Sequence, residues 1–168
     1  MYERDKNRPC IVMWSCGNES LGGENILEVS KYFKSKDKER LVHYEGVFFD
    51  RTTAISDIES RMYDKIENVE EFLNNNPDRP FIYCEYAHAM GNSHGNFFKY
   101  QNLTRKYKLY QGGFIWEFKD HSLLVDRNGK KELMYGGDFD DRPTDGNFVC
   151  DGIIEGNRTL TPKIVEVK

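Results

Sequence analysis

Short, continuous apolar segments alternate with helical segments along most of this 168-residue chain. The apolar runs predict strands at 9–14, 41–44, 80–84 and 113–116, with a weaker strand near 58–63. Helical spacing predicts helices at 24–34, 68–75 and 97–107, and polar composition predicts a loop at 50–53. After Asp120, loops and short extended pieces are expected. Uninterrupted apolar strands between helices are typical of a parallel α/β sheet that is covered on both faces.

Polar residues with useful chemistry follow the carboxyl ends of these predicted strands. Asn18 and Glu19 follow the first strand, Glu85 follows the strand at 80–84, and Trp116 with Glu117 ends the strand at 113–116. A (β/α)₈ barrel carries its active site at this end of the strands, and a doubly wound sheet does so too. A complete barrel typically needs about 250 residues. The chain, with four to five strands, therefore suggests half of a barrel.

Composition restricts the class of partner. The formal net charge is −4 and no basic block is present, which argues against nucleic acid. No apolar run is long enough to span a membrane. Aromatic residues make up 14% of the chain and fit either a large core or a sugar-binding cleft. The irregular spacing of the four cysteines favours buried free thiols, a reducing compartment and a cytoplasmic location.

Two glutamates at strand ends suit glycoside cleavage. One carboxyl group protonates the leaving oxygen, and the other attacks the anomeric carbon or activates water. Taken singly, Glu19 and Glu85 could each be a solvated strand end or a cap. The two together, near Asn18 and His88, are less ordinary and favour catalysis.

Several segments resemble the large, lactose-cleaving β-galactosidase branch of glycoside hydrolase family 2. Residues 14–20 are similar to the acid/base signature of that family, and residues 84–93 are similar to its nucleophile signature. Residues 112–116 and 135–139 match further blocks in the same order. The resemblance implies that residues 1–168 form the C-terminal half of a catalytic TIM barrel, roughly strands four to eight, within a larger multidomain protein.

The resemblance also implies roles for the two glutamates. Glu19 would be the general acid/base after the fourth barrel strand, and Glu85 would be the nucleophile after the seventh. Hydrolysis would retain the anomeric configuration through a covalent galactosyl-enzyme, with the two carboxyl groups about 5–5.5 Å apart. At that separation one carboxyl pKa should rise, so that this group keeps its proton.

Further positions correspond to substrate contacts in the family. Asn18 would donate to the sugar 2-hydroxyl, His88 would bind galactose hydroxyls, and Trp116 would form the floor under galactose. The other residues assigned to the substrate site are Met62, Tyr63, which would bond to the nucleophile, and Asp145. Without the resemblance, Asn18 would be a turn residue, His88 structural and Tyr63 part of the core.

The resemblance implies two metal cofactors, Mg²⁺ and Na⁺. Glu19 would be one ligand of a partial magnesium site, and Phe148 and Asp151 would contribute to a sodium site. Asp151 stands where the best-studied relatives have Asn, and a charged oxygen ligand would strengthen the cation site or change its ion preference.

The expected substrates are terminal β-galactosides such as lactose, with no nucleic-acid or membrane partner. A β-glucuronidase or β-mannosidase of the same family, or a carbohydrate-binding module without turnover, remain the alternatives. An isolated half barrel should be inactive or nearly so. It should also self-associate through unpaired strand edges.

Overall fold

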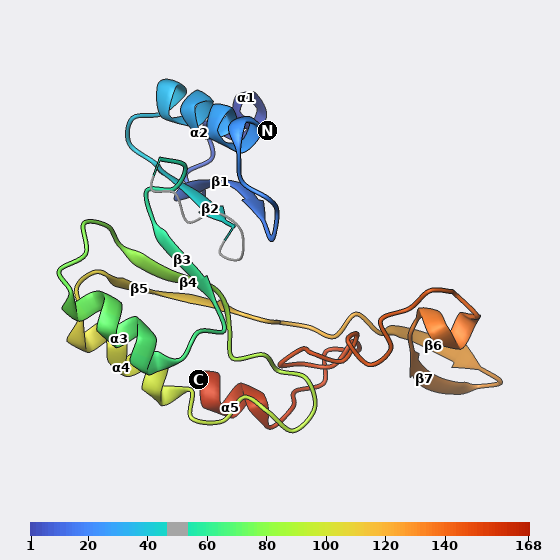
Figure 1. Ribbon diagram of the computed structural model, residues 1–168. Helices are drawn as coiled ribbons and strands as arrows, with labels where there is room; N and C mark the ends of the chain where they lie inside the picture. Colours follow the sequence, from blue (N-terminus) through green and yellow to red (C-terminus); the bar gives the residue numbers. More distant parts are fainter. Residues whose placement is uncertain (47–53) are drawn as a thin grey trace. The chain divides into compact units, whose positions relative to one another are not determined.

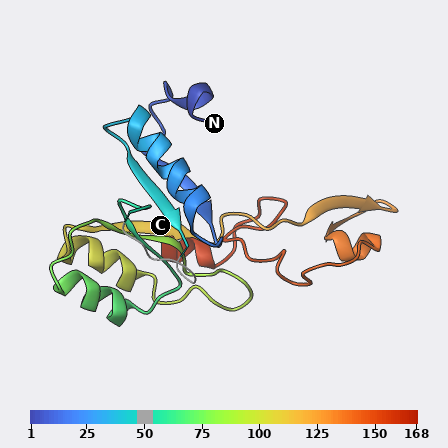
Figure 2. The ribbon, with the colours of Figure 1, turned by 45° about the horizontal axis from the view of Figure 1, so that its top comes forward.

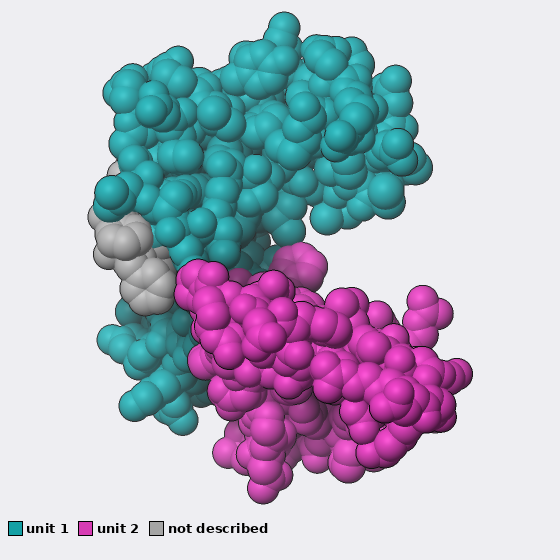
Figure 3. All heavy atoms as spheres, turned by 90° about the vertical axis from the view of Figure 1, so that its right-hand side faces the viewer, with its two compact units in different colours: residues 1–84, 106–112 teal, residues 85–105, 113–168 magenta. Residues whose placement is uncertain are grey.

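The computed structural model describes residues 1–46 and 54–168. The polar loop predicted at 50–53 lies outside the described residues. The chain folds as two compact units (Figure 3). Unit 1 comprises residues 1–84 and 106–112, and unit 2 comprises residues 85–105 and 113–168.

Unit 1 begins with a β-α-β segment. After the short helix α1 (Tyr2–Asp5), β1 (Met13–Asn18) is connected by α2 (Glu24–Lys36) to β2 (Leu41–Glu45). β1 and β2 are parallel, and their register shifts between Ser15 and Asn18. α2 packs against both strands (Figure 2). The core between them contains Trp14, Phe33 and Val42, and the rings of Trp14 and Phe33 stack at 5.4 Å.

A second sheet has the strand order β3-β4-β5 (Figure 1). Its elements in chain order are β3 (Glu59–Met62), α3 (Ile66–Asn74), β4 (Phe81–Tyr86), α4 (Phe98–Lys106) and β5 (Tyr110–Ile115). Helices thus connect strands that are neighbours in the sheet, which is the βαβ connectivity of a barrel. Phe81 and Tyr110 stack at 5.8 Å in the core of unit 1.

The last part of unit 2 is largely irregular. It contains an antiparallel hairpin of β6 (Leu123–Arg127) and β7 (Lys130–Met134), the 3₁₀ helix η1 (Gly136–Phe139) and α5 (Lys163–Val167). The hairpin turn is Asn128-Gly129, and both residues have positive φ. This matches the two-residue type I′ turn, whose twist suits a hairpin. The core of the unit contains Ala89, Ile153 and Ile154.

The predicted alternation of strands and helices is confirmed, and so is the parallel α/β class of a partial barrel. The sheets of the described residues do not close into a barrel. Several strand bounds differ from prediction: β1 begins at Met13 rather than at residue 9, and β5 spans Tyr110–Ile115 rather than 113–116. β1 continues through the polar residues to Asn18 because they pair with β2, and Glu85 lies inside β4 rather than after it. The hairpin at 123–134 was not predicted as such.

The cysteines are correctly predicted to form no disulfide, but their burial is only partly as expected. Cys16 and Cys84 are half-buried, whereas Cys10 and Cys150 are exposed. Within the described ranges, no helix combines the length and apolar character needed to cross a bilayer.

Candidate active site

Three of the predicted functional segments share one backbone feature. Glu19 follows β1, Tyr63 follows β3 and Ala87 follows β4, and these three residues have φ values of 49°, 51° and 51°. Residues with a side chain adopt this left-handed region uncommonly, and they cluster at functional sites. The chain therefore turns sharply where each of these strands ends, next to the residues that the sequence marks as functional.

Unit 1 presents Asn18 and Glu19 at the end of β1. Asn18 pairs with Glu45 of β2, and the backbone N–H of Glu19 donates to the carbonyl oxygen of Glu45 at 2.9 Å. Both side chains are exposed. The backbone of Glu19 is thus fixed by the neighbouring strand, while its carboxylate remains accessible.

Unit 1 also carries the predicted substrate residues Met62 and Tyr63. Met62 is the last residue of β3 and is half-buried, and Tyr63 is exposed directly after it. These residues occupy a strand end, as predicted. Their contact with substrate remains a prediction.

Unit 2 carries Glu85, the penultimate residue of β4, which is half-buried. The segment that follows Glu85 is hydrogen-bonded to the end of β5. The N–H of Trp116 donates to Tyr86 O at 3.1 Å, and the N–H of Ala89 donates to Trp116 O at 2.8 Å. This ladder brings His88 and Trp116 into the same region of the unit.

Three of the predicted residues gather near the buried carboxylate of Asp151. The indole Nε1 of Trp116 donates to Asp151 Oδ2 at 3.1 Å, and His88 Nε2 lies 3.9 Å from the same oxygen. The rings of His88 and Phe148 meet edge to face at 6.0 Å. Asp145 is exposed, and its carbonyl accepts a backbone hydrogen bond from Phe148. The structure therefore brings His88, Trp116, Phe148 and Asp151 together.

Two residues without a predicted role belong to the same cluster. His121 Nε2 lies 2.7 Å from Glu117 Oε1, and one ligand atom each of Glu117, His121 and Asp151 lie within 4.8 Å of one another. Burial raises the pKa of Glu117, and Asp151 adds to this effect while His121 opposes it. The position of Glu117 at a strand end beside Trp116 could have indicated a functional role from the sequence. No local sequence pattern indicates a role for His121.

This cluster offers two carboxylates and one imidazole as potential cation ligands. Asp151 is 1% exposed, and within the described part of the chain its Oδ1 has no hydrogen-bond partner. A buried carboxylate oxygen with an unused lone pair suits a cation ligand. The sodium assignment of Asp151 is thus consistent with its surroundings, although Phe148 is largely exposed. For magnesium, no cluster of three or more potential ligands among the described residues includes Glu19.

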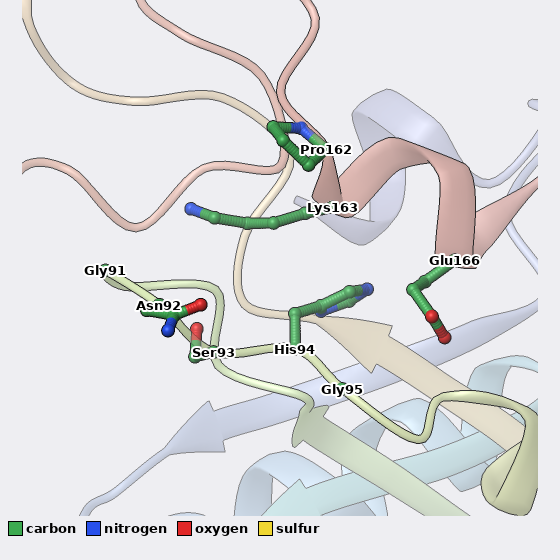
Figure 4. A pocket seen from close by; sticks show the side chains of 8 residues that line it. All are labelled: Gly91, Asn92, Ser93, His94, Gly95, Pro162, Lys163 and Glu166. Carbon is green, nitrogen blue, oxygen red and sulfur yellow. The ribbon is translucent and has the colours of Figure 1, made fainter.

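A cavity of about 320 Å³ lies within unit 2, between the loop after β4 and α5 (Figure 4). It is lined by Gly91, Asn92, Ser93, His94, Gly95, Pro162, Lys163 and Glu166. None of the predicted site residues lines it. Lys163 donates from Nζ to Ala89 O and, at 3.1 Å, to Gly152 O. The wall of the cavity therefore ties the loop after Glu85 to the segment that holds Asp151.

Comparison with known proteins identifies curated relatives at high identity. The chain is 58% identical over its whole length to a β-galactosidase of Halalkalibacterium halodurans, and it covers 17% of that protein. It is 48% identical over 99% of its length to the β-galactosidase large subunit of Leuconostoc lactis, and it covers 27% of that protein. The chain thus spans well under a third of each of these relatives.

Solved structures share the fold at much lower identity. A β-glucuronidase from an uncultured Clostridium sp. superposes with a TM-score of 0.62 at 21% identity, over 99% of this chain and 33% of that one. At this identity the likeness shows the fold alone. The family described as glycosyl hydrolases family 2, TIM barrel domain, matches residues 1–168, so the chain belongs to glycosyl hydrolase family 2 and is part of its TIM barrel domain.

Proposed function

We propose that the full-length protein containing this chain hydrolyses terminal β-D-galactosides, such as lactose, with retention of configuration. The observation that carries this proposal is the 58% identity to a relative named β-galactosidase, in a chain that has Glu19 and Glu85 at the ends of β1 and β4. The family requires two carboxyl groups, and Glu19 and Glu85 both lie at strand ends, where a barrel of this kind builds its active site.

The proposed reaction has two displacements. Glu85 attacks the anomeric carbon while Glu19 protonates the glycosidic oxygen, so the carbon–oxygen bond breaks and the alcohol leaves. Glu19, now a carboxylate, then takes a proton from water as the water attacks the same carbon and releases Glu85. This scheme requires the two carboxyl groups to meet about 5–5.5 Å apart in the folded protein.

The accessibility of Trp116 supports its proposed contact with substrate. Trp116 is 36% exposed while its Nε1 is held by Asp151, so a face of the indole is available to pack on a pyranose ring. We propose that His88 binds galactose hydroxyls beside it and that Asn18 donates to the 2-hydroxyl. Met62, Tyr63 and Asp145 would complete the substrate site.

We also propose a sodium ion at Phe148 and Asp151 and a magnesium ion bound in part by Glu19. The unpartnered Oδ1 of Asp151 supports the sodium assignment. A bound cation in this region would order the segment next to Trp116 and neutralise the buried carboxylate.

The test uses the full-length protein and three nitrophenyl glycosides. We expect the β-galactoside to be cleaved with a much larger kcat/KM than the β-glucuronide or the β-mannoside, and preference for either of those would reassign the specificity. A 2-deoxy-2-fluoro galactoside should label Glu85, as peptide mass spectrometry can show, and Glu85→Gln should abolish the label. Sugar binding without turnover or labelling would instead indicate a carbohydrate-binding module.

The isolated 168-residue chain is expected to behave differently. We propose that it is inactive on galactosides and self-associates through its unpaired strand edges. Galactosidase assay and sizing chromatography of this chain test both points. Turnover by the isolated chain, or elution as a strict monomer, would contradict them.

A further inference from the structure

A chain of polar side chains crosses the four strands β1 to β4 within unit 1. Ser15 Oγ lies 2.9 Å from His43 Nδ1, and His43 Nε2 lies 2.8 Å from Ser60 Oγ. The hydroxyl of Ser60 donates to Glu45 Oε2 at 2.5 Å, and the thiol of Cys84 donates to the same oxygen at 3.0 Å. A polar network of this kind fixes the register of the strands that contribute to it.

The hydrogen bonds have one consistent direction. Ser60 has a single proton and gives it to Glu45, so its oxygen must accept the proton on His43 Nε2. A neutral imidazole then has a lone pair on Nδ1, which accepts from the hydroxyl of Ser15. Burial lowers the pKa of His43 to about 4, which keeps the ring neutral at physiological pH. Every donor in the network therefore points toward the carboxylate of Glu45.

Glu45 is 1% exposed, so its desolvation must be offset by these donors. Its position lets the residue contact both the segment of Glu19 and the segment of Glu85. Its carbonyl oxygen accepts the backbone N–H of Glu19, and its side chain accepts the thiol of Cys84, the residue directly before Glu85. One residue thus contacts the backbone of the proposed acid/base and the neighbour of the proposed nucleophile.

We infer that Glu45 is a positioning residue for the glycosidase reaction, holding the ends of β1 and β4 in the register that the two catalytic glutamates require. This inference rests on the proposed function. Glu45 acts through Glu19 and Cys84 and does not touch the substrate. Displacement of a catalytic group by about 1 Å can lower a rate by about 100-fold.

The test compares Glu45→Leu with Glu45→Gln in the full-length protein. Leucine removes the acceptor, whereas glutamine retains an oxygen that Ser60 and Cys84 can reach. We expect Glu45→Leu to lower kcat on a nitrophenyl β-galactoside by about 10- to 100-fold with a much smaller change in KM. Glu45→Gln should recover most of the lost kcat. The matched control is Glu28→Gln, which alters an exposed ion pair on α2 and should leave kcat unchanged.

A second pair of variants keeps the inference testable if Glu45→Leu fails to fold. Cys84→Ala removes one donor and should lower kcat several-fold, and Cys84→Ser should restore it. An unchanged kcat in Glu45→Leu or Cys84→Ala, even with a lower melting temperature, would overturn the inference. Equal losses in Glu45→Leu and Glu45→Gln would also overturn it. An inactive wild-type protein would instead overturn the proposed function itself.

Discussion

Glu45 in unit 1 and Asp151 in unit 2 are both buried carboxylates with 1% exposure, yet their oxygens are used differently. Glu45 Oε2 accepts hydrogen bonds from the hydroxyl of Ser60 in β3 and from the thiol of Cys84 in β4. Asp151 receives one indole N–H on Oδ2, and its Oδ1 has no hydrogen-bond partner within the described ranges. The first environment is that of a structural anchor, and the second leaves an oxygen for a ligand or cation.

The most severe test asks whether the two units serve one reaction. Glu19→Gln alters unit 1 and Glu85→Gln alters unit 2. If both glutamates act in one site, each substitution should lower kcat on lactose by at least about 1,000-fold in the full-length protein. Steady-state assay measures this, and loss in only one of the two variants would show that the units do not share a catalytic site.

A smaller effect is expected from the Asp151 cluster. Asp151→Ala leaves the Trp116 indole N–H without its acceptor and frees the ring that would form the sugar floor. We expect kcat/KM for a β-galactoside to fall by about 10- to 100-fold, chiefly through KM. Glu132→Gln, in the exposed hairpin strand β7, is the matched control. A change in kcat without a change in KM would indicate that Asp151 has a structural role like that of Glu45 rather than a role in substrate binding.

Removal of one hydrogen-bond donor from Glu45 should lower the stability of the folded protein. Ser60→Ala leaves the buried carboxylate with fewer hydrogen bonds and should lower the free energy of unfolding by about 1–3 kcal/mol. The control is Ser35→Ala, whose exposed hydroxyl bonds only within α2 and should matter by less than about 0.5 kcal/mol. Thermal melting of the two variants compares them, and equal melting temperatures would contradict the anchoring role of Ser60.

The smallest expected effect concerns pH. The pKa of His43 is lowered from 6.5 to about 4 in the folded chain, so the unfolded chain binds more protons between these values. Stability from His43 is present above pH 6.5 and is lost as pH falls toward 4. Lowering the pH from 7.5 to 5.5 should therefore cost about 1 kcal/mol, and His43→Asn should remove this part of the pH dependence. A variant with the full wild-type pH dependence would contradict this assignment.

The sequence was sufficient to predict most elements and the strand-end glutamates, because apolar runs and helical spacing are local signals. The polar network escaped prediction because its partners are distant: Glu45 and Cys84 are 39 positions apart. Within the run Leu41–Glu45, His43 and Glu45 look like the exposed positions of a strand, and only the tertiary fold buries them.

Contacts between residues far apart in the sequence also explain the errors at strand ends and the residues that were missed. β1 was expected to stop at residue 14 because apolarity ends there, whereas backbone pairing with β2 carries it to Asn18. Asp151 was assigned by resemblance, but its hydrogen bond to Trp116 joins residues 35 positions apart. Glu117 and His121 complete that cluster through contacts that no local pattern encodes.

Lys163 connects two segments that carry residues of the proposed site. Its ammonium group donates to the carbonyls of Ala89, in the loop that continues from Glu85, and of Gly152, the neighbour of Asp151. Acetylation of this amine would remove its charge and most of its donor capacity. A single modified lysine would then release the loop after Glu85 and the Asp151 segment together, so that the proposed covalent chemistry and the proposed sugar recognition would weaken in the same step.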